Sequence, residues 1–338
     1  MYTRFYHLSA NPFQMTPDSR FYFESDVHRR AMAYLLFGLE QAEGFMILTG
    51  DVGAGKTTIL SHLLERLDPK AYVTAKIVST HLQSDDMLRA IAAAFSLPFQ
   101  GLDKATLLSR IENFLVATFN QGLRTLLLVD EAQNMPPAAL EELRMLSNFQ
   151  VGPRAPLQGI LMAQPQFRRV LANPDLEQFR QRIVASHHLG PIGVAETRDY
   201  IRYRLSVVGW ADDPLISEEA YTDIYTLTGG VPRKINTFCN RMMLFCFLDE
   251  LHRIDGATVR AVADDLAREI GQSIEMTDTP VSAGVMHQPP PLDDPRFEHR
   301  LAELEQTVAT HGRSMKFFSA LQVLVDRGQT ELVWRRRP

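Results

Sequence analysis

A glycine-rich segment near residue 50 constrains the fold of this chain more than any other part of its sequence. It fits the pattern G-x-x-x-x-G-K-[ST], in which glycines allow backbone N–H groups to surround a phosphate chain. An apolar run at 44–49 precedes it, and residues 58–67 follow with apolar side chains at helical spacing. The sequence therefore predicts a strand, a phosphate-binding Walker A loop and a helix. The expected loop residues are Gly50, Asp51, Val52, Gly53, Ala54, Gly55, Lys56, Thr57 and Thr58.

Two side chains of this loop are expected to act directly on a bound nucleotide. The Lys56 ammonium would reach the terminal phosphates, and the Thr57 hydroxyl would bind Mg²⁺. The start of the following helix adds partial positive charge at the same place. A glycine turn that matches the pattern by chance is the alternative, and the flanking strand and helix argue against it. ATP and Mg²⁺ are therefore the expected cofactors.

Two carboxylates follow a second apolar run. Asp130 and Glu131 come directly after residues 125–129, which read as a buried strand. Side chains at this end of a parallel strand emerge beside the phosphate-binding loop. Asp130 would hold Mg²⁺ through a coordinated water, and Glu131 would polarise the water that attacks the γ-phosphate. The alternative is an N-cap pair for the next helix. Together with a complete Walker A loop, the pair predicts an ATPase site.

Two polar side chains further along the chain are candidates for the same site. Gln164 follows the apolar run 159–163 and would read the γ-phosphate or position the water, unless it is a loop amide bonded to backbone. Arg233 stands at a helix start behind Pro232, a residue that suits a first helical turn. It would point into the cleft and couple nucleotide binding to closure of a lid. A solvated Arg233 is the alternative.

Two arginines precede the last predicted strand, 183–189. Arg180 or Arg182 would lie at an edge of the sheet and reach the ATP of a neighbouring subunit, where guanidinium stabilises transition-state charge. Surface arginines without a role are common, so both stay open. Arg182 is preferred because the buried strand that begins at Ile183 would fix its position.

Five segments are expected along the chain. Residues 1–44 read as an N-terminal arm and helix packed on the core, and 45–190 as the α/β P-loop core. Residues 191–270 lose the strand pattern and read as a small all-helical lid. Residues 271–296 are proline-rich and read as a linker, and 297–338 as an amphipathic helix with a basic tail.

The core segment alternates apolar strands with helices. Strands are expected at 44–49, 72–78, 125–129, 159–163 and 183–189. Continuously apolar strands separated by helices indicate a parallel sheet that is covered on both faces. In the arm, Pro12 and Phe13 are equally open to simple packing and to a place in the pocket for the adenine base.

Composition limits the kinds of partner. The chain has 338 residues and a net charge of −5, which gives no general electrostatic case for nucleic acid or anionic membranes. Neither a membrane-spanning run nor a signal-like start is seen, so a cytoplasmic protein is expected. The two cysteines, Cys239 and Cys246, lie two helical turns apart and are expected as buried thiols. Apolar residues of 297–327 form a heptad seam, for a coiled-coil partner or for docking on the main body.

Several short stretches together resemble the AAA+ superfamily, and within it the ATPases related to the general secretion pathway A component. They cover residues 1 to about 270. The resemblance supports the roles given to Gln164, Arg182 and Arg233. Residues 1–13 and 21–28 are similar to one branch, the secretion ATPases of PEP-CTERM/exosortase and exopolysaccharide loci. The matching stretches are residues 11–13, 17–18, 43–58, 127–133 (LLVDEAQ), 163–165, 181–183 and 229–236 (GGVPRKIN).

Two functions follow as expectations. The first is an oligomeric, ATP-hydrolysing motor or switch that serves bacterial envelope export, PEP-CTERM sorting or exopolysaccharide assembly, with partners bound through residues 297–338. The second is a DNA-associated nucleotide switch, like related transposition and replication-initiation proteins. It calls for a basic face or an added helix-turn-helix module, and the sequence shows neither.

Overall fold

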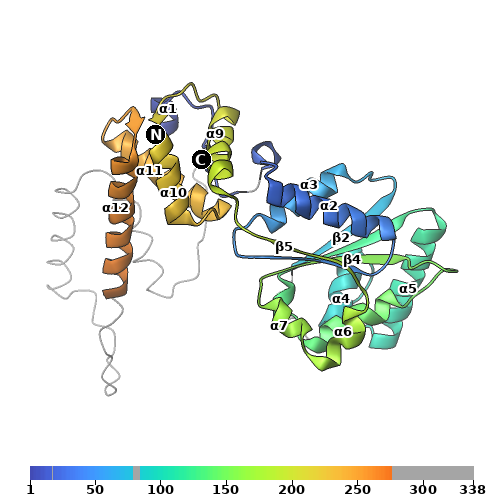
Figure 1. Ribbon diagram of the computed structural model, residues 1–338. Coiled ribbons are helices and arrows are strands. Elements are labelled where there is room, and N and C mark those ends of the chain that lie inside the picture. The colour runs from blue at the N-terminus through green and yellow to red at the C-terminus, as the bar shows by residue number, and fades with distance from the viewer. Residues whose placement is uncertain (17, 79–83, 276–338) are drawn as a thin grey trace, which may run out of the picture. The chain divides into compact units, whose positions relative to one another are not determined.

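A parallel sheet forms the centre of the first half of the protein (Figure 1). The computed structural model describes residues 1–16, 18–78 and 84–275. The sheet has five strands in the order β2-β3-β4-β1-β5, and every neighbouring pair is parallel. This arrangement confirms the expected α/β fold. The strands are β1 (Phe45–Gly50), β2 (Tyr72–Val78), β3 (Arg124–Asp130), β4 (Leu157–Ala163) and β5 (Ile183–Leu189).

Helices cover both faces of the sheet. Leu126 and Leu128 of β3 point to one apolar layer, whereas Leu127 and Val129 point to the other, since side chains alternate along a strand. Both layers exclude water, so β1 and β4 are buried along their whole length, and their side chains are mostly apolar. The first face carries α2 (Asp26–Gln41) and α3 (Lys56–Arg66), and the second carries α4 (Ser84–Ala94), α5 (Lys104–Asn120) and α6 (Pro137–Ser147).

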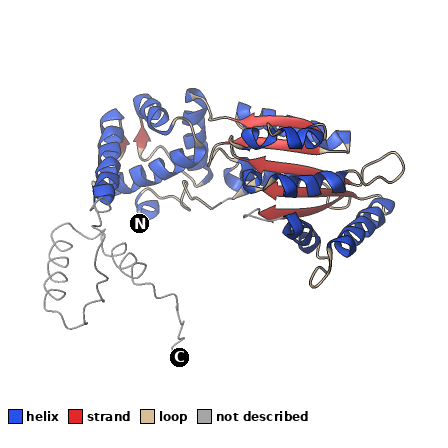
Figure 2. Cartoon of the chain, turned by 90° about the horizontal axis from the view of Figure 1, so that it is seen from below, coloured by secondary structure: helices blue, strands red, loops and turns tan. Residues whose placement is uncertain are grey.

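Short elements connect the edge of the sheet to its helices. Figure 2 shows the strands side by side, so that their carboxyl ends meet at one edge. Loops that follow β1, β3 and β4 therefore lie together, and they carry the candidate site. The remaining short elements are η1 (Ser19–Phe21), η2 (Ala132–Asn134), α7 (Phe167–Leu171), η3 (Pro174–Leu176) and α8 (Glu177–Arg180).

The second half of the described chain is a helical subdomain with one unexpected feature. Its helices are α9 (Val194–Val207), α10 (Glu218–Thr228), α11 (Pro232–Leu248) and α12 (Gly256–Glu275). The expectation of an all-helical segment was wrong in one detail, because β6 (Leu215–Ile216) and β7 (Arg253–Ile254) pair in parallel. Two-residue strands carry too little pattern to be read from sequence. Cys239 and Cys246 are buried and unpaired in α11, and burial raises the pKa of Cys246 to about 12.

The N-terminal arm packs elsewhere than expected. Helix α1 (Tyr2–Phe5) and the residues after it enter the apolar core of the helical subdomain, where Tyr2, Tyr6 and Phe13 are buried. Within residues 1–44, α2 packs on the sheet, and η1 contacts α3, where Tyr22 stacks on His62. The expectation that residues 1–44 pack on the P-loop core therefore holds for α2 and for residues 19–22, and not for the first part of the arm. The Tyr6 hydroxyl donates to the carbonyl of Leu251, and such long-range contacts are not visible in a local sequence pattern.

Two of the expected segments lie wholly or largely outside the described residues. These are the amphipathic helix and tail, 297–338, and most of the linker, 271–296. Helix α12 continues into the first residues assigned to the linker and reaches Glu275. Among the described helices, none is both long and apolar enough to cross a membrane.

Candidate functional site

The glycine-rich loop joins β1 to α3 in the backbone conformation that its sequence requires. Gly53 and Gly55 have φ angles of 83° and 99°, a region that side chains with a Cβ rarely adopt. Gly55 directly precedes Lys56, the first residue of α3, so the free N–H groups of the helix start face the loop. A Cβ on Gly55 would lie 2.6 Å from His28 Nε2. The loop therefore surrounds a space with backbone N–H groups, and neither Gly53 nor Gly55 could carry a side chain without strain or overlap.

Lys56 is buried at this loop. Its ammonium donates to the carbonyl of Gly50 at 2.7 Å and to that of Asp51 at 3.0 Å. Burial lowers the pKa of Lys56, while Glu131, Asp130 and Asp51 act in the opposite direction because their negative charge favours the ammonium. The structure thus brings Lys56 together with the two carboxylates that sequence reasoning assigned to the site.

Asp130 ends β3, and Glu131 follows it in an uncommon backbone conformation. Asp130 Oδ1 accepts the backbone N–H of Glu131 at 3.0 Å, and its Oδ2 lies 3.3 Å from Lys76 Nζ. Glu131 has a φ of 54°, in the left-handed region that is uncommon for residues with a side chain. Strained backbone of this kind is held by the surrounding structure and clusters at active sites. The turn aims the Glu131 carboxylate into the cavity described below.

Two glutamines hold the Glu131 carboxylate. Gln133 donates from Nε2 to Glu131 Oε2 at 2.5 Å, and Gln164 donates from Nε2 to the same oxygen at 3.2 Å. The Gln133 amide oxygen accepts the backbone N–H of Gln164 at 2.9 Å, which ties β3 to β4. Sequence reasoning selected Gln164 but missed Gln133, although it stands only two residues after Glu131. A polar side chain that close to a candidate base was the available signal.

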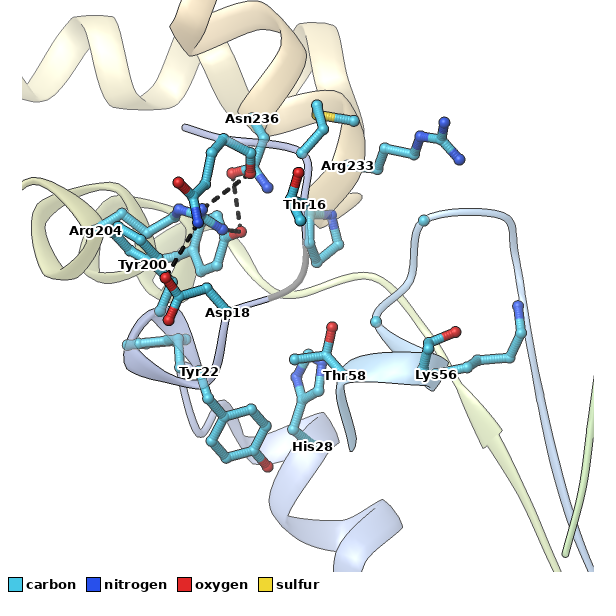
Figure 3. Close-up of a pocket in the computed structure, with 18 of the residues that line it drawn as sticks. Thr16, Asp18, Tyr22, His28, Lys56, Thr58, Tyr200, Arg204, Arg233 and Asn236 are labelled. Atoms are coloured by element: carbon cyan, nitrogen blue, oxygen red, sulfur yellow. Dashed lines mark hydrogen bonds between the residues drawn. The ribbon is translucent and has the colours of Figure 1, made fainter. Parts of the chain in front are cut away.

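The helical subdomain supplies the opposite wall of a cavity of ≈340 Å³. Tyr200, Arg204 and Asn236 lie there, linked by Tyr200 Oη to Asn236 Oδ1 at 2.9 Å and Arg204 Nη1 to Tyr200 Oη at 2.9 Å (Figure 3). Arg233 also lines the cavity, and its backbone N–H donates to the Gly53 carbonyl. The full lining is Gln14, Met15, Thr16, Asp18, Phe21, Tyr22, Phe23, His28, Val52, Gly53, Gly55, Lys56, Thr57, Thr58, Glu131, Tyr200, Arg204, Pro232, Arg233 and Asn236.

Pro12 and Phe13 do not line this cavity. Phe13 is 1% exposed inside the helical subdomain, and the Pro12 carbonyl accepts from Arg204 Nε at 2.6 Å. The next residues of the arm, Gln14 to Thr16, reach the cavity wall instead. Of the two interpretations that the sequence left open for Pro12 and Phe13, simple packing describes where they lie.

The two candidate arginines have different surroundings. Arg180 Nη1 donates to the carbonyls of Leu171 and Asn173, at 2.5 and 2.7 Å, and so fastens its own loop. Arg182 Nη2 contacts only a side chain, Asn148 Oδ1, at 2.8 Å. It stands directly before β5, an edge strand of the sheet. Neither arginine lines the cavity.

The residues present fit a magnesium nucleotide. Within the described residues, no group of three or more His, Cys, Asp or Glu side chains could hold a metal by itself. Thr57 would supply one oxygen near the loop, Asp130 would hold a water bound to the metal, and phosphate oxygens and further water would complete the octahedron that Mg²⁺ prefers. The backbone cradle and the start of α3 suit phosphate.

Comparison with known proteins agrees with this geometry. Residues 39–171 match the family described as the AAA domain. This part of the chain is therefore similar to an AAA domain. The fold of the chain is also seen in CDC6p from Pyrobaculum aerophilum, with a TM-score of 0.61, 17% identity and coverage of 75% of this chain and 70% of that one. The ORC2 protein of Aeropyrum pernix gives a TM-score of 0.56, 15% identity and coverage of 76% and 71%.

A relative of higher identity lies among secretion proteins. General secretion pathway protein A from Aeromonas hydrophila is 37% identical over 255 residues, which are 75% of this chain and 46% of the relative. The chain thus spans about half the length of that protein. The aligned length is greater than the AAA domain, so the similarity continues into other parts of the chain.

Proposed function

We propose that this protein binds ATP with Mg²⁺ and hydrolyses it. The observation that carries the proposal is the Glu131 carboxylate, held by Gln133 and Gln164 on the cavity that contains Lys56. A carboxylate positioned at a phosphate-binding loop is what activation of an attacking water requires. The Aeropyrum pernix structure, which shares the fold, was described as ADPNP and ADP complexes, and this supports the same ligand class here.

Each residue has a definite task in this proposal. Lys56 leaves the carbonyls of Gly50 and Asp51 and donates to phosphate oxygens instead. Bound magnesium neutralises phosphate charge, and Thr57 and Asp130 would hold it. Glu131 accepts a hydrogen bond from the attacking water and receives its proton. Gln164 orients that carboxylate through its amide.

Two arginines would link hydrolysis to movement and assembly. Arg233 begins α11 against the loop, so a phosphate bound there also acts on the helical subdomain. Arg182 would act in trans on the nucleotide of a second copy, because it lies outside its own cavity and its guanidinium donates to a side chain, Asn148, rather than to backbone. The active form in this proposal is an ATP-dependent homo-oligomer.

The biological setting proposed is bacterial envelope export. The 37% identity to a general secretion pathway protein supports it, and the assignment to PEP-CTERM sorting or exopolysaccharide assembly rests on the resemblance of residues 1–13 and 21–28. Partners would be envelope assembly proteins, bound through residues 297–338. Protein of this kind would work in the cytoplasm, with any contact to a membrane made through those partners.

Sizing by light scattering is the first test. We would compare the wild-type protein with Glu131→Gln, each with and without ATP and Mg²⁺, and measure phosphate release in parallel. The proposal expects Glu131→Gln to bind ATP, to lose at least about a hundredfold in turnover and to accumulate as an ATP-bound oligomer. Normal turnover would remove Glu131 from its role, and a monomer in every condition would contradict the oligomeric mechanism.

The DNA-associated alternative is tested separately. Net charge of −5 argues against it, whereas a phosphate-dependent contact with DNA would make binding steeply dependent on salt. Tight, salt-sensitive binding to duplex DNA would favour a DNA-associated switch over envelope export. Absence of such binding at low salt would exclude it.

A further inference from the structure

Lys76 is a cation at the magnesium position that no motif of the sequence indicated. It lies on β2, and its ammonium is 3.3 Å from Asp130 Oδ2. Strand β2 pairs with β3 in parallel, with Val78 opposite Asp130 and Lys76 two residues earlier. The lysine side chain therefore extends along the strand to the carboxyl edge of the sheet.

Asp130 needs a positive partner in its position. Its side chain is 11% exposed, and a carboxylate so far removed from water must be compensated by donors or by opposite charge. One oxygen receives the backbone N–H of Glu131. Lys56 does not serve the other, because its ammonium donates to the carbonyls of Gly50 and Asp51. The remaining oxygen, Oδ2, lies against Lys76.

The Lys76 side chain can also move from Asp130 into solvent. Strand β2 is at an edge of the sheet, and its residues Thr74, Lys76 and Val78 are all exposed on the face opposite Ala75 and Ile77. The Lys76 side chain is 37% exposed, so its ammonium can turn into water without disturbing the core. A buried lysine could not be displaced in this way, because it would carry its charge into an apolar layer.

We propose that Lys76 competes with magnesium for Asp130. The carboxylate exchanges one cation for the other, and the freed ammonium moves to the open face of β2. A lysine charge within ion-pair distance of the metal position opposes Mg²⁺, since like charges repel most strongly where water is excluded. Because of this competition, Mg²⁺ should bind well only when a nucleotide is present. The nucleotide phosphates provide further oxygen ligands, which Asp130 and Thr57 are too few to provide by themselves. This inference rests on the proposed nucleotide site.

The test measures magnesium rather than turnover. The complete chain would be titrated with Mg²⁺ in the presence of a fluorescent ADP analogue, and the Mg²⁺ concentration for half-maximal binding recorded. Lys76→Met should lower this concentration by about fivefold, the factor that corresponds to about 1 kcal/mol for a partly exposed ion pair. Lys76→Arg keeps the charge and should stay close to the wild type.

Lys70→Met is the matched control, because it removes the same charge from an exposed position just before β2. It should leave the Mg²⁺ requirement unchanged. An unchanged value for Lys76→Met, or a higher one, would overturn the inference, the second by showing that Lys76 holds Asp130 ready for the metal. Weaker binding of the analogue without Mg²⁺ would also overturn it, since Lys76 would then contact phosphate. Binding of the analogue by the wild-type protein that does not depend on Mg²⁺ would overturn the inference alone, whereas no binding with or without Mg²⁺ would mean that the proposed function itself fails.

Discussion

The backbone N–H of Arg233 donates to the carbonyl of Gly53 at 3.2 Å, so the first turn of α11 rests on the phosphate-binding loop. A Cβ added to Gly53 would overlap the Cβ of Arg233. The loop and the helix are thus in contact without any side chain between them. A ligand that changes the conformation of the loop would therefore also change this contact with the first turn of α11.

Gly53→Ala should separate strain from crowding at this contact. Gly122 provides the matched control, because its φ of 80° is close to the 83° of Gly53 and a Cβ there would meet nothing within 4 Å. Gly122→Ala should cost about 1–2 kcal/mol of unfolding free energy, from backbone strain alone. Gly53→Ala should cost about 1–3 kcal/mol more, measured by urea denaturation. Equal costs would mean that α11 moves away from the loop without penalty.

Gln133→Ala tests whether this glutamine positions Glu131. The change removes one amide donor from the carboxylate and leaves Gln164 in place. Turnover should fall at least about tenfold while the KM for ATP stays unchanged, because Gln133 does not line the cavity. Gln133→Glu keeps an acceptor for the Gln164 N–H but puts a second carboxylate beside Glu131. Its turnover should fall as well, since two carboxylates at this distance repel each other and Glu131 leaves its position. Normal turnover in both variants would contradict the positioning role.

Arg180→Ala should lower the stability of the protein, whereas Arg182→Ala should lower its ATPase activity. Arg180 satisfies two backbone carbonyls, so its loss should reduce the free energy of unfolding by about 1–3 kcal/mol. The Arg182 guanidinium donates to the Asn148 side chain, and the backbone hydrogen bonds of Arg182 do not depend on its side chain, so Arg182→Ala should leave the melting temperature near that of the wild type. Its ATPase activity should nevertheless fall at least about a hundredfold if the residue acts in trans. Mixing it with Lys56→Ala should restore part of the activity, because each variant supplies what the other lacks. No recovery would argue against action between subunits.

Lys56→Ala should abolish nucleotide binding without unfolding the protein. The variant loses the charge that the phosphates require. It also leaves two carbonyls without their donor, one from the exposed Asp51 and one from the buried Gly50. Affinity for ATP, measured by calorimetry, should fall at least about a hundredfold. Lys70→Ala is the control and should bind ATP as the wild type does. Unchanged affinity in Lys56→Ala would remove the loop from the proposed site.

His28 should make stability depend on pH below neutrality. The ring is buried against Gly55, with Nδ1 2.6 Å from Ser25 Oγ, and burial lowers the pKa of His28 to about 4. In the unfolded chain His28 binds a proton near pH 6.5, whereas in the folded chain it binds one only near pH 4. Stability therefore falls as the pH drops through this interval, by about 2 kcal/mol between pH 7 and 5.

The measurement compares His28→Gln with the wild type in urea at both pH values. His28→Gln should lose most of that pH dependence, whatever its stability at pH 7. His7→Asn is the control, because His7 is exposed, and asparagine tolerates its φ of 54°. An equal fall in stability for His28→Gln and the wild type would assign the pH dependence to other groups.

Much of the fold could be predicted because local patterns and tertiary structure agree. The five strands lie where continuous apolar runs indicated them, with ends within two residues of the expected positions. The strand pair β6–β7 was missed because two residues carry no period. The arm was misplaced because Tyr2, Tyr6 and Phe13 would be equally apolar against either half of the chain. Only long-range contacts, such as Tyr2 Oη to Asn240 Oδ1, decide between the two.

The sequence by itself determined the elements that depend on backbone chemistry. The pattern of a phosphate-binding loop is visible in the sequence, from glycines at 53 and 55, Lys56 at the start of a helix and carboxylates after an apolar strand. Only the tertiary structure decided which side chains from other parts of the chain lie beside that loop and its carboxylates. Gln133 and Gln164 share an oxygen of Glu131, and Lys76 reaches Asp130 from the neighbouring strand, because sheet order brings together residues that are far apart in the chain. Strand order is a property of the whole packed core, and no local segment encodes it.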